Sequence, residues 1–75
     1  MLIGRADCGL CEELAAGLAA VARRLTLPAL QHVDVDGDAD LRRRYGLHVP
    51  VLLLDGVEVC RHRLDEAELR RLLRR

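Results

Sequence analysis

Two cysteines are separated by two residues in the segment Cys8-Gly9-Leu10-Cys11. Such a pair can exchange electrons with a disulfide, supply half of a metal site, or close a structural disulfide. The surroundings favour the first, because an apolar run over 1–4 precedes the pair and an amphipathic pattern follows it. The thiols then lie at a strand-to-helix junction, where a Cys-x-x-Cys pair is typical of redox chemistry. The sequence therefore predicts a dithiol centre that moves electrons between thiols and disulfides.

Cys8 is the predicted nucleophile of this centre. A thiolate attacks disulfides, and a free cysteine, with a pKa of about 8.5, is mostly protonated at neutral pH. Unpaired backbone N–H groups and the dipole at a helix start favour a negatively charged sulfur. Negative charge at the same end opposes this, and it comes from the carboxylates of Asp7, Glu12 and Glu13. One cation, Arg5, is nearby. We expect a moderately lowered pKa for Cys8, with Cys11 resolving the mixed disulfide.

Composition bounds the class of protein. The chain has 75 residues, 51% of them hydrophobic, with Tyr45 as the single aromatic residue. This length fits one domain, 1–75, with a core of Leu, Val and Ala. Twelve basic residues balance twelve acidic ones, so the formal net charge is zero. With no net positive field and no aromatic platform for bases, we expect no nucleic-acid partner.

The cysteine count and the apolar runs bear on the compartment. Acidic residues at 7, 12 and 13 interrupt any signal-like apolar stretch, and no run reaches the roughly 20 residues that cross a bilayer. Three cysteines, an odd number, argue against a disulfide-stapled scaffold. We therefore expect a cytoplasmic protein, monomeric and without a membrane partner.

The first half of the chain predicts a βαβ unit. Leu2-Ile3 is typical of a short buried strand, and apolar residues then recur at helical spacing over 11–24. Leu27-Pro28 stops the helix, because a residue before proline avoids the helical region. The pattern over 29–35 favours a second strand.

The middle of the chain predicts a short helix. Asp38 is suited to cap its start, and the helix is expected to end at Tyr45-Gly46. Glycine is common just past a helix end because it adopts positive φ, so we expect that conformation for Gly46. Val49-Pro50 then leads into the next element.

The last third predicts a hairpin followed by a helix. Asp55-Gly56 separates the apolar run 51–54 from 57–61 and is a strong two-residue hairpin signal. Asp65, with Glu68 three positions later, is an aspartate version of a capping box at the start of a last helix. The expected order of elements is βαβαββα.

This order resembles the thioredoxin fold in its smallest form, and glutaredoxin-like proteins are the most similar subgroup. The resemblance rests on three motifs in the right order: the segment 7–11 with both cysteines, the segment 45–51 around Val49-Pro50, and the hairpin with Leu64-Asp65 before the last helix. It covers essentially the whole chain. It implies an α/β fold with a four-stranded mixed sheet flanked by helices on both faces.

The resemblance also implies the substrate contacts. In that family the proline aligned with Pro50 is cis and faces the cysteines, and the backbone of the residue aligned with Val49 pairs with the substrate chain. We expect His48 and Arg5 to join these contacts. The implied partner is a disulfide-containing protein or a low-molecular-weight thiol, and no cofactor is expected.

Two departures bear on glutathione as a co-substrate. Glutaredoxins proper have threonine where this chain has His48, and a glycine pair where it has Cys60-Arg61-His62. These differences argue against glutathione, which stays the second candidate as a co-substrate.

A metal site is the alternative interpretation of the cysteines. Tetrahedral zinc takes four ligands, and the chain could offer Cys8, Cys11, Cys60 and His62. If the fourth strand lies two places from the first, roughly 10 Å of sheet separates the two halves of this set. The main hypothesis is a thiol-disulfide oxidoreductase or electron carrier, and the alternative is a non-catalytic thioredoxin-fold binding module whose Cys-x-x-Cys binds zinc or another metal.

Overall fold

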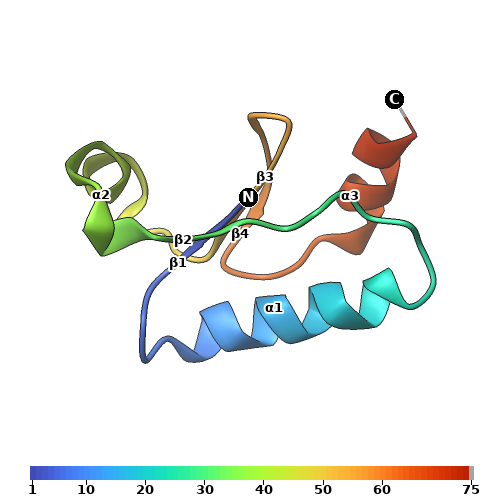
Figure 1. Ribbon diagram of the computed structural model, residues 1–75, viewed down its shortest axis with the longest axis horizontal. Helices are drawn as coiled ribbons and strands as arrows, with labels where there is room; N and C mark the ends of the chain where they lie inside the picture. The colour runs from blue at the N-terminus through green and yellow to red at the C-terminus, as the bar shows by residue number, and fades with distance from the viewer. Residues whose placement is uncertain (75) are drawn as a thin grey trace.

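The computed structural model describes residues 1–74. Its elements follow in the order β1 (Leu2–Gly4), α1 (Gly9–Ala22), β2 (His32–Asp34), a 3₁₀ turn η1 (Val35–Gly37), α2 (Ala39–Tyr45), β3 (Val51–Leu54), β4 (Val57–Arg61) and α3 (Glu66–Leu73). The predicted order βαβαββα is confirmed, with the 3₁₀ turn as an addition (Figure 1).

The four strands form one mixed sheet in the order β2-β1-β3-β4. Strand β1 pairs parallel with β2 and antiparallel with β3, placing Ile3 opposite Val51. Strands β3 and β4 pair antiparallel. This topology is thioredoxin-like, and it puts the strand that leads to the cysteines next to the strand that follows Pro50.

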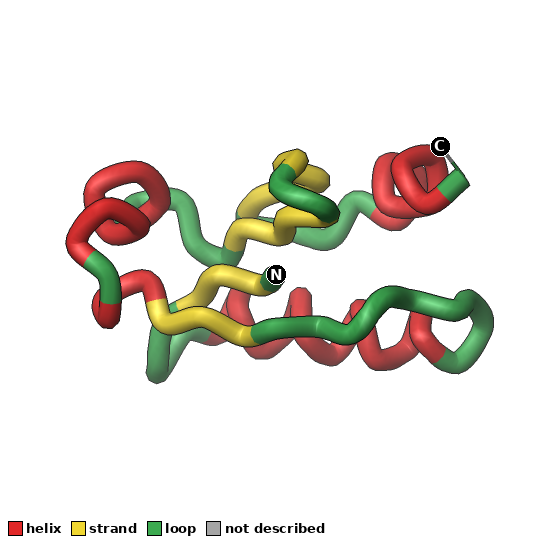
Figure 2. The backbone as a smooth tube through the Cα atoms, turned by 45° about the horizontal axis from the view of Figure 1, so that its top comes forward, coloured by secondary structure: helices red, strands yellow, loops and turns green. Residues whose placement is uncertain are grey.

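Helices cover both faces of the sheet, as expected. One core packs the sheet against α1 and α3, and its buried members are Leu2, Leu14, Leu18, Val21, Leu52, Val59, Leu69 and Leu72. Neighbouring strand residues point to opposite faces, so Ile3 and Val51 face the other side, where they pack with Val35 and Tyr45. Figure 2 shows the strands between α2 and α1.

Helix α1 lies two residues earlier than the predicted 11–24. It starts at Gly9 because Cys8 has extended backbone angles and its Sγ accepts a hydrogen bond from the Cys11 amide, which makes Cys8 the N-cap. The helix ends at Ala22, because the next amides turn back to Ala20 and Val21. Pro28 therefore lies well beyond the helix end.

Strand β2 is shorter than the predicted 29–35. It pairs with β1 only over His32–Asp34, and one further bond joins the Leu2 amide to the Gln31 carbonyl oxygen at 2.7 Å. Val35 already belongs to η1, where it is fully buried. The apolar pattern marked a buried position correctly but could not tell strand from 3₁₀ turn.

The turn and cap signals are largely confirmed. Asp55 and Gly56 have φ of 51° and 79°, the two positive values that a type I′ hairpin requires. Asp38 and Asp65 cap α2 and α3 with their side chains. The capping box is only half made, because the Glu68 carboxylate pairs with Arg71 instead.

The prediction of positive φ for Gly46 is wrong. Its φ is −54°, a right-handed helical value. The glycine is required for another reason: a Cβ at this position would overlap the carbonyl oxygen of Arg42, which accepts a hydrogen bond from the Gly46 amide. Gly46 therefore lets the chain leave α2 tightly toward Pro50.

Among residues 1–74, no helix combines the length and the apolar character needed to cross a membrane.

Candidate redox site

Cys8 and Cys11 form a disulfide at the start of α1. The Cys11 amide donates to the Cys8 Sγ at 3.1 Å, and the Cys8 carbonyl oxygen accepts from the Glu12 amide at the same distance. Both cysteines are half-buried. The first sulfur therefore occupies the helix start that the sequence predicted, next to N–H groups that favour an anion.

Gly4 brings the second sulfur onto the sheet. A Cβ added at Gly4 would lie 3.3 Å from the Cys11 Sγ, so the sulfur packs where a side chain would otherwise be. Since Ile3 is opposite Val51 in the β1–β3 pairing, the next position along each strand sets Gly4 across from Pro50. The disulfide and Pro50 consequently lie at the same end of the two central strands, β1 and β3.

Pro50 follows a cis peptide bond after Val49, as the resemblance implied. Pro50 is buried and Val49 is half-buried, and both directly precede β3. Contact of either residue with a substrate stays a prediction.

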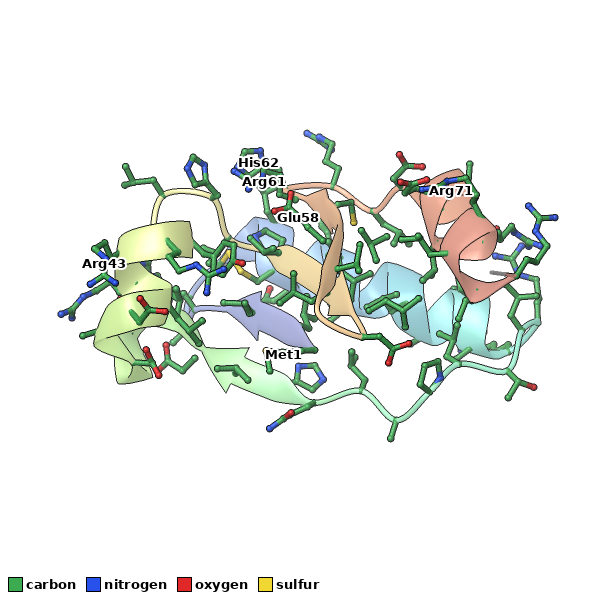
Figure 3. The ribbon with its side chains drawn as sticks, turned by 90° about the horizontal axis from the view of Figure 1, so that it is seen from above. Met1, Arg43, Glu58, Arg61, His62 and Arg71 are labelled. Carbon is green, nitrogen blue, oxygen red and sulfur yellow. A yellow bond between two sulfur atoms is a disulfide. The ribbon has the colours of Figure 1, made fainter. Side chains whose placement is uncertain are left out.

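Two histidines lie beside Pro50. The His62 amide, just past β4, donates to the Pro50 carbonyl oxygen at 2.8 Å. The rings of His48 and His62 have centroids 6.1 Å apart. Figure 3 shows the side chains of His62, Arg61 and Glu58 near one another, with Arg61 and His62 at the C-terminal end of β4. His48 and His62 therefore both lie near Pro50, and contact of His48 with a substrate stays a prediction.

Arg61, the arginine of β4, forms an ion pair with Glu58. Arg61 donates two hydrogen bonds to the Glu58 carboxylate, at 2.8 and 2.7 Å. These bonds hold the pKa of Glu58 below its ordinary value. The Arg61 guanidinium is therefore bound within β4, beside the two histidines.

Arg5 is bound to the protein itself. Its guanidinium donates to both carboxylate oxygens of Asp36, at 2.8 and 3.0 Å, and to the Gly46 carbonyl oxygen at 3.0 Å. The pKa of Asp36 is lowered, chiefly by the hydrogen bond from Arg5. The side chain expected to contact substrate thus makes three hydrogen bonds within the chain, to two residues.

Sequence reasoning missed one apolar feature of the site. Leu47, two residues before Val49, is 93% exposed, and Leu10, between the two cysteines, is 37% exposed. A leucine beside the Val-Pro segment was visible in the sequence, but only the fold shows that it packs on nothing.

Cys60 is a half-buried residue of β4 opposite Leu52. Burial raises the pKa of its thiol. Within residues 1–74, no three His, Cys, Asp or Glu side chains come together as metal ligands. The four ligands of the zinc alternative are therefore not assembled, since the first two are joined as a disulfide and β3 lies between β1 and β4.

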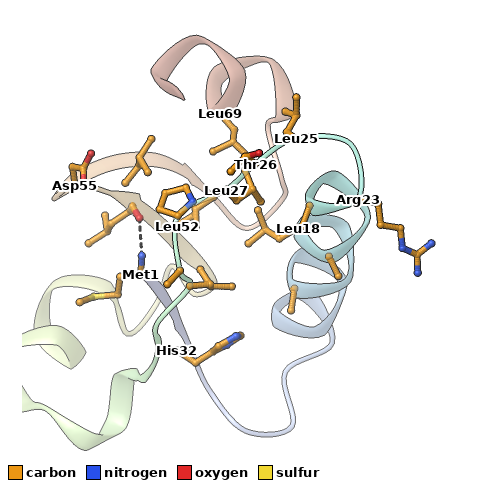
Figure 4. Close-up of a pocket in the computed structure, with 18 of the residues that line it drawn as sticks. Met1, Leu18, Arg23, Leu25, Thr26, Leu27, His32, Leu52, Asp55 and Leu69 are labelled. Atoms are coloured by element: carbon orange, nitrogen blue, oxygen red, sulfur yellow. Dashed lines mark hydrogen bonds between the residues drawn. The ribbon is translucent and has the colours of Figure 1, made fainter. Parts of the chain in front are cut away.

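Residues 1–74 form hollows on the surface, and two of them bear on the site. The larger, about 830 Å³, lies between the C-terminal half of α1, the segment 23–30 and the β3 end, and neither Cys8 nor Cys11 lines it (Figure 4). The smaller, about 530 Å³, adjoins Cys11, Gly4 and Arg5. The smaller hollow therefore leaves the second sulfur approachable from the β2 side.

Gly4→Ala is expected to make the disulfide easier to reduce. The added methyl crowds the Cys11 Sγ, which is fixed in the disulfide but free to rotate away in the dithiol. Overpacking on the order of 1 kcal/mol would shift the thiol-exchange equilibrium about fivefold toward the dithiol. Exchange with a dithiol buffer measures this. Gly9→Ala is the matched control, because a Cβ at Gly9 meets nothing within 4 Å. Equal constants for both variants would contradict the expectation.

Known proteins resemble this chain over nearly its full length. The model of the glutaredoxin-like domain (DUF836) matches residues 1–74. An uncharacterized protein of Mycobacterium bovis is 36% identical over 74 residues, which cover 92% of this chain and 75% of the relative. Uncharacterized proteins of two Mycobacterium tuberculosis strains give the same values. With this match, and with a disulfide between Cys8 and Cys11 at the start of α1, the chain belongs to the glutaredoxin-like domain family.

Proposed function

We propose that the protein is a thiol-disulfide oxidoreductase that uses Cys8 and Cys11 to reduce disulfides of proteins or small molecules. One observation carries the proposal: a Cys8–Cys11 disulfide at a helix start, at the end of the central strands where Pro50 also lies. Partly exposed sulfurs at such a position combine an ionisable nucleophile with access for a partner.

The reaction begins from the dithiol. The Cys8 thiolate attacks one sulfur of a substrate disulfide, forms a mixed disulfide and releases the other sulfur as a thiolate, which takes up a proton. Cys11 then loses its proton and attacks the Cys8 sulfur, which restores the Cys8–Cys11 bond and releases the second substrate thiol. Two electrons pass to the substrate. A low-molecular-weight thiol or a partner dithiol, itself oxidised, returns them.

Local hydrogen bonding supports Cys8 as the attacking group. The Cys11 amide already points at the Cys8 Sγ, at 3.1 Å. A donor in that place stabilises a thiolate in the reduced protein and a thiolate leaving group when the disulfide is attacked. Arg5 does not offset the acidic residues at the start of α1, because its guanidinium is bound to Asp36. The proposed pKa of Cys8 is therefore only moderately lowered.

The substrate is proposed to dock along the edge formed by Val49 and Pro50. His48 and His62 flank this edge on the β4 side, and Leu47 offers an exposed apolar contact. Such a surface fits an extended segment on one side of a protein disulfide. Glutathione is the weaker candidate, because His48 and the segment 60–62 stand where glutaredoxins proper have a threonine and a glycine pair. We place the activity in the cytoplasm, in a monomer.

A redox titration of the Cys8–Cys11 pair tests the proposal. The protein is equilibrated with graded ratios of reduced and oxidised dithiothreitol, and thiols are trapped by alkylation and counted by mass. We expect one reversible two-electron transition, unchanged in Cys60→Ser, which removes the third thiol. A pair that stays oxidised throughout, or a reduced protein that holds a stoichiometric metal displaced by thiol-blocking reagents, would overturn the proposal.

A further inference from the structure

Arg5 belongs by its backbone to the segment that carries the disulfide. It directly follows β1 and is three residues before Cys8. Its side chain leaves this segment and crosses to two others. The Nε and Nη2 atoms donate to the Asp36 carboxylate in η1, and Nη1 donates to the carbonyl oxygen of Gly46.

The two acceptors are themselves fixed. The Asp36 amide donates to Asp34 Oδ1 at 2.9 Å, which holds the turn after β2. Gly46 is buried, and its amide donates to the Arg42 carbonyl oxygen at 2.9 Å. A guanidinium is planar and presents its donors in a rigid fork, so three hydrogen bonds to fixed acceptors define its position closely.

Gly46 begins the segment 46–50, which ends at Pro50. Beyond Gly46, the His48 amide donates to the Tyr45 carbonyl oxygen at 2.8 Å, and the chain then reaches Val49 and Pro50. The Arg5 guanidinium therefore links the disulfide segment to the segment 46–50, in addition to the β1–β3 pairing.

We propose that Arg5 is a positioning residue: it holds the segment 46–50 at a fixed distance from Cys8 and Cys11. The inference rests on the proposed function. A substrate must place its sulfur at Cys8 while its backbone lies along Val49, and misplacement by about 1 Å can cost about a hundredfold in rate. Neither the substrate nor the sulfurs need touch the guanidinium for Arg5 to matter.

Arg5→Gln tests this role through two different reactions. Turnover of a protein disulfide uses the 46–50 segment, whereas alkylation of reduced Cys8 by iodoacetamide does not. We expect kcat/KM for disulfide reduction to fall about tenfold, with the alkylation rate and its pH profile within about twofold of the wild type. A parallel fall in alkylation would show that Arg5 acts on Cys8 by its charge and would overturn the inference.

Arg5→Lys separates the charge from the fork. Lysine keeps the positive charge but cannot reproduce the paired hydrogen bonds to Asp36. We expect its turnover to stay close to that of Arg5→Gln. Wild-type turnover in Arg5→Lys would refute the positioning role. Asp36→Asn, which leaves Arg5 intact and weakens the pair from the other side, is expected to lower turnover in the same direction.

Arg24→Gln is the matched control. Arg24 also forms an exposed ion pair, to Glu66 at 3.1 Å, but this pair joins the segment after α1 to α3. Its removal should leave turnover unchanged. A loss equal to that of Arg5→Gln would indicate a general stability effect and contradict the inference.

Amide exchange of His48 gives a readout that needs no activity. Loss of the fork should let the 46–50 segment open more often, so exchange at this amide should rise about tenfold in Arg5→Gln and stay constant in Arg24→Gln. If the wild type does not reduce disulfides, the proposed function fails, and this measurement still decides whether Arg5 holds the segment. Unchanged exchange in Arg5→Gln would refute that hold.

Discussion

Cys8→Ser is expected to abolish disulfide reduction, with a loss of at least about 10³-fold in turnover. A serine hydroxyl stays protonated at neutral pH and cannot form the mixed disulfide that starts the reaction. The substitution replaces one sulfur atom by oxygen at the N-cap of α1. Serine is a good N-cap residue, so the helix should persist. Turnover with a protein disulfide measures the loss, and the helical signal in circular dichroism verifies the fold.

Cys11→Ser is the companion variant and should fail differently. Cys8 can still attack, so a mixed disulfide with the substrate should accumulate in one-to-one ratio and then stall, because the resolving thiol is missing. Mass spectrometry under non-reducing conditions detects this adduct. Equal turnover in the two variants, or an adduct on Cys8→Ser instead, would contradict the assigned order of attack.

Leu14→Ala is expected to have the largest effect on stability. Leu14 is 1% exposed and packs in the core between α1, α3 and the sheet. Truncating a fully buried leucine costs about 2–5 kcal/mol, from lost burial and the cavity left behind. In a domain of this size that lowers the melting temperature by roughly 10 °C or more.

Leu47→Ala is the matched control for this substitution. The same atoms are removed from a side chain that is 93% exposed, so the free energy of unfolding should change little. Thermal unfolding of both variants, followed by circular dichroism in the same redox state, gives the comparison. Similar melting temperatures for both would show that the α1–α3 core is not packed as described.

Local signals in the sequence accounted for much of the fold. Asp55-Gly56 marked the hairpin because its two positive φ values depend on adjacent residues alone. Asp38 and Asp65 marked helix starts for a similar reason, since a cap bonds to amides two or three residues on. Such features depend on short-range chemistry, which a sequence displays directly.

Features that depend on distant contacts were out of reach. The bonds of Arg5 span 31 and 41 residues, to Asp36 and Gly46, and no local pattern pairs those positions. The role of Gly46 was misjudged for the same reason: glycine was read as a choice of φ, while the constraint is steric, between the position of a Cβ and the Arg42 carbonyl oxygen. The exposed state of Leu47 likewise follows only from what the fold leaves uncovered.

Tyr45 gives the protein a built-in optical probe. It is the single aromatic residue of the chain and lies in the layer between α2 and the sheet, with the Arg44 guanidinium 5.0 Å from its ring centre. Because the chain has no tryptophan, its tyrosine emission comes from this one residue and responds to the packing of that layer. Emission and circular dichroism recorded together during denaturation therefore reveal whether the two sides of the sheet come apart in one cooperative step.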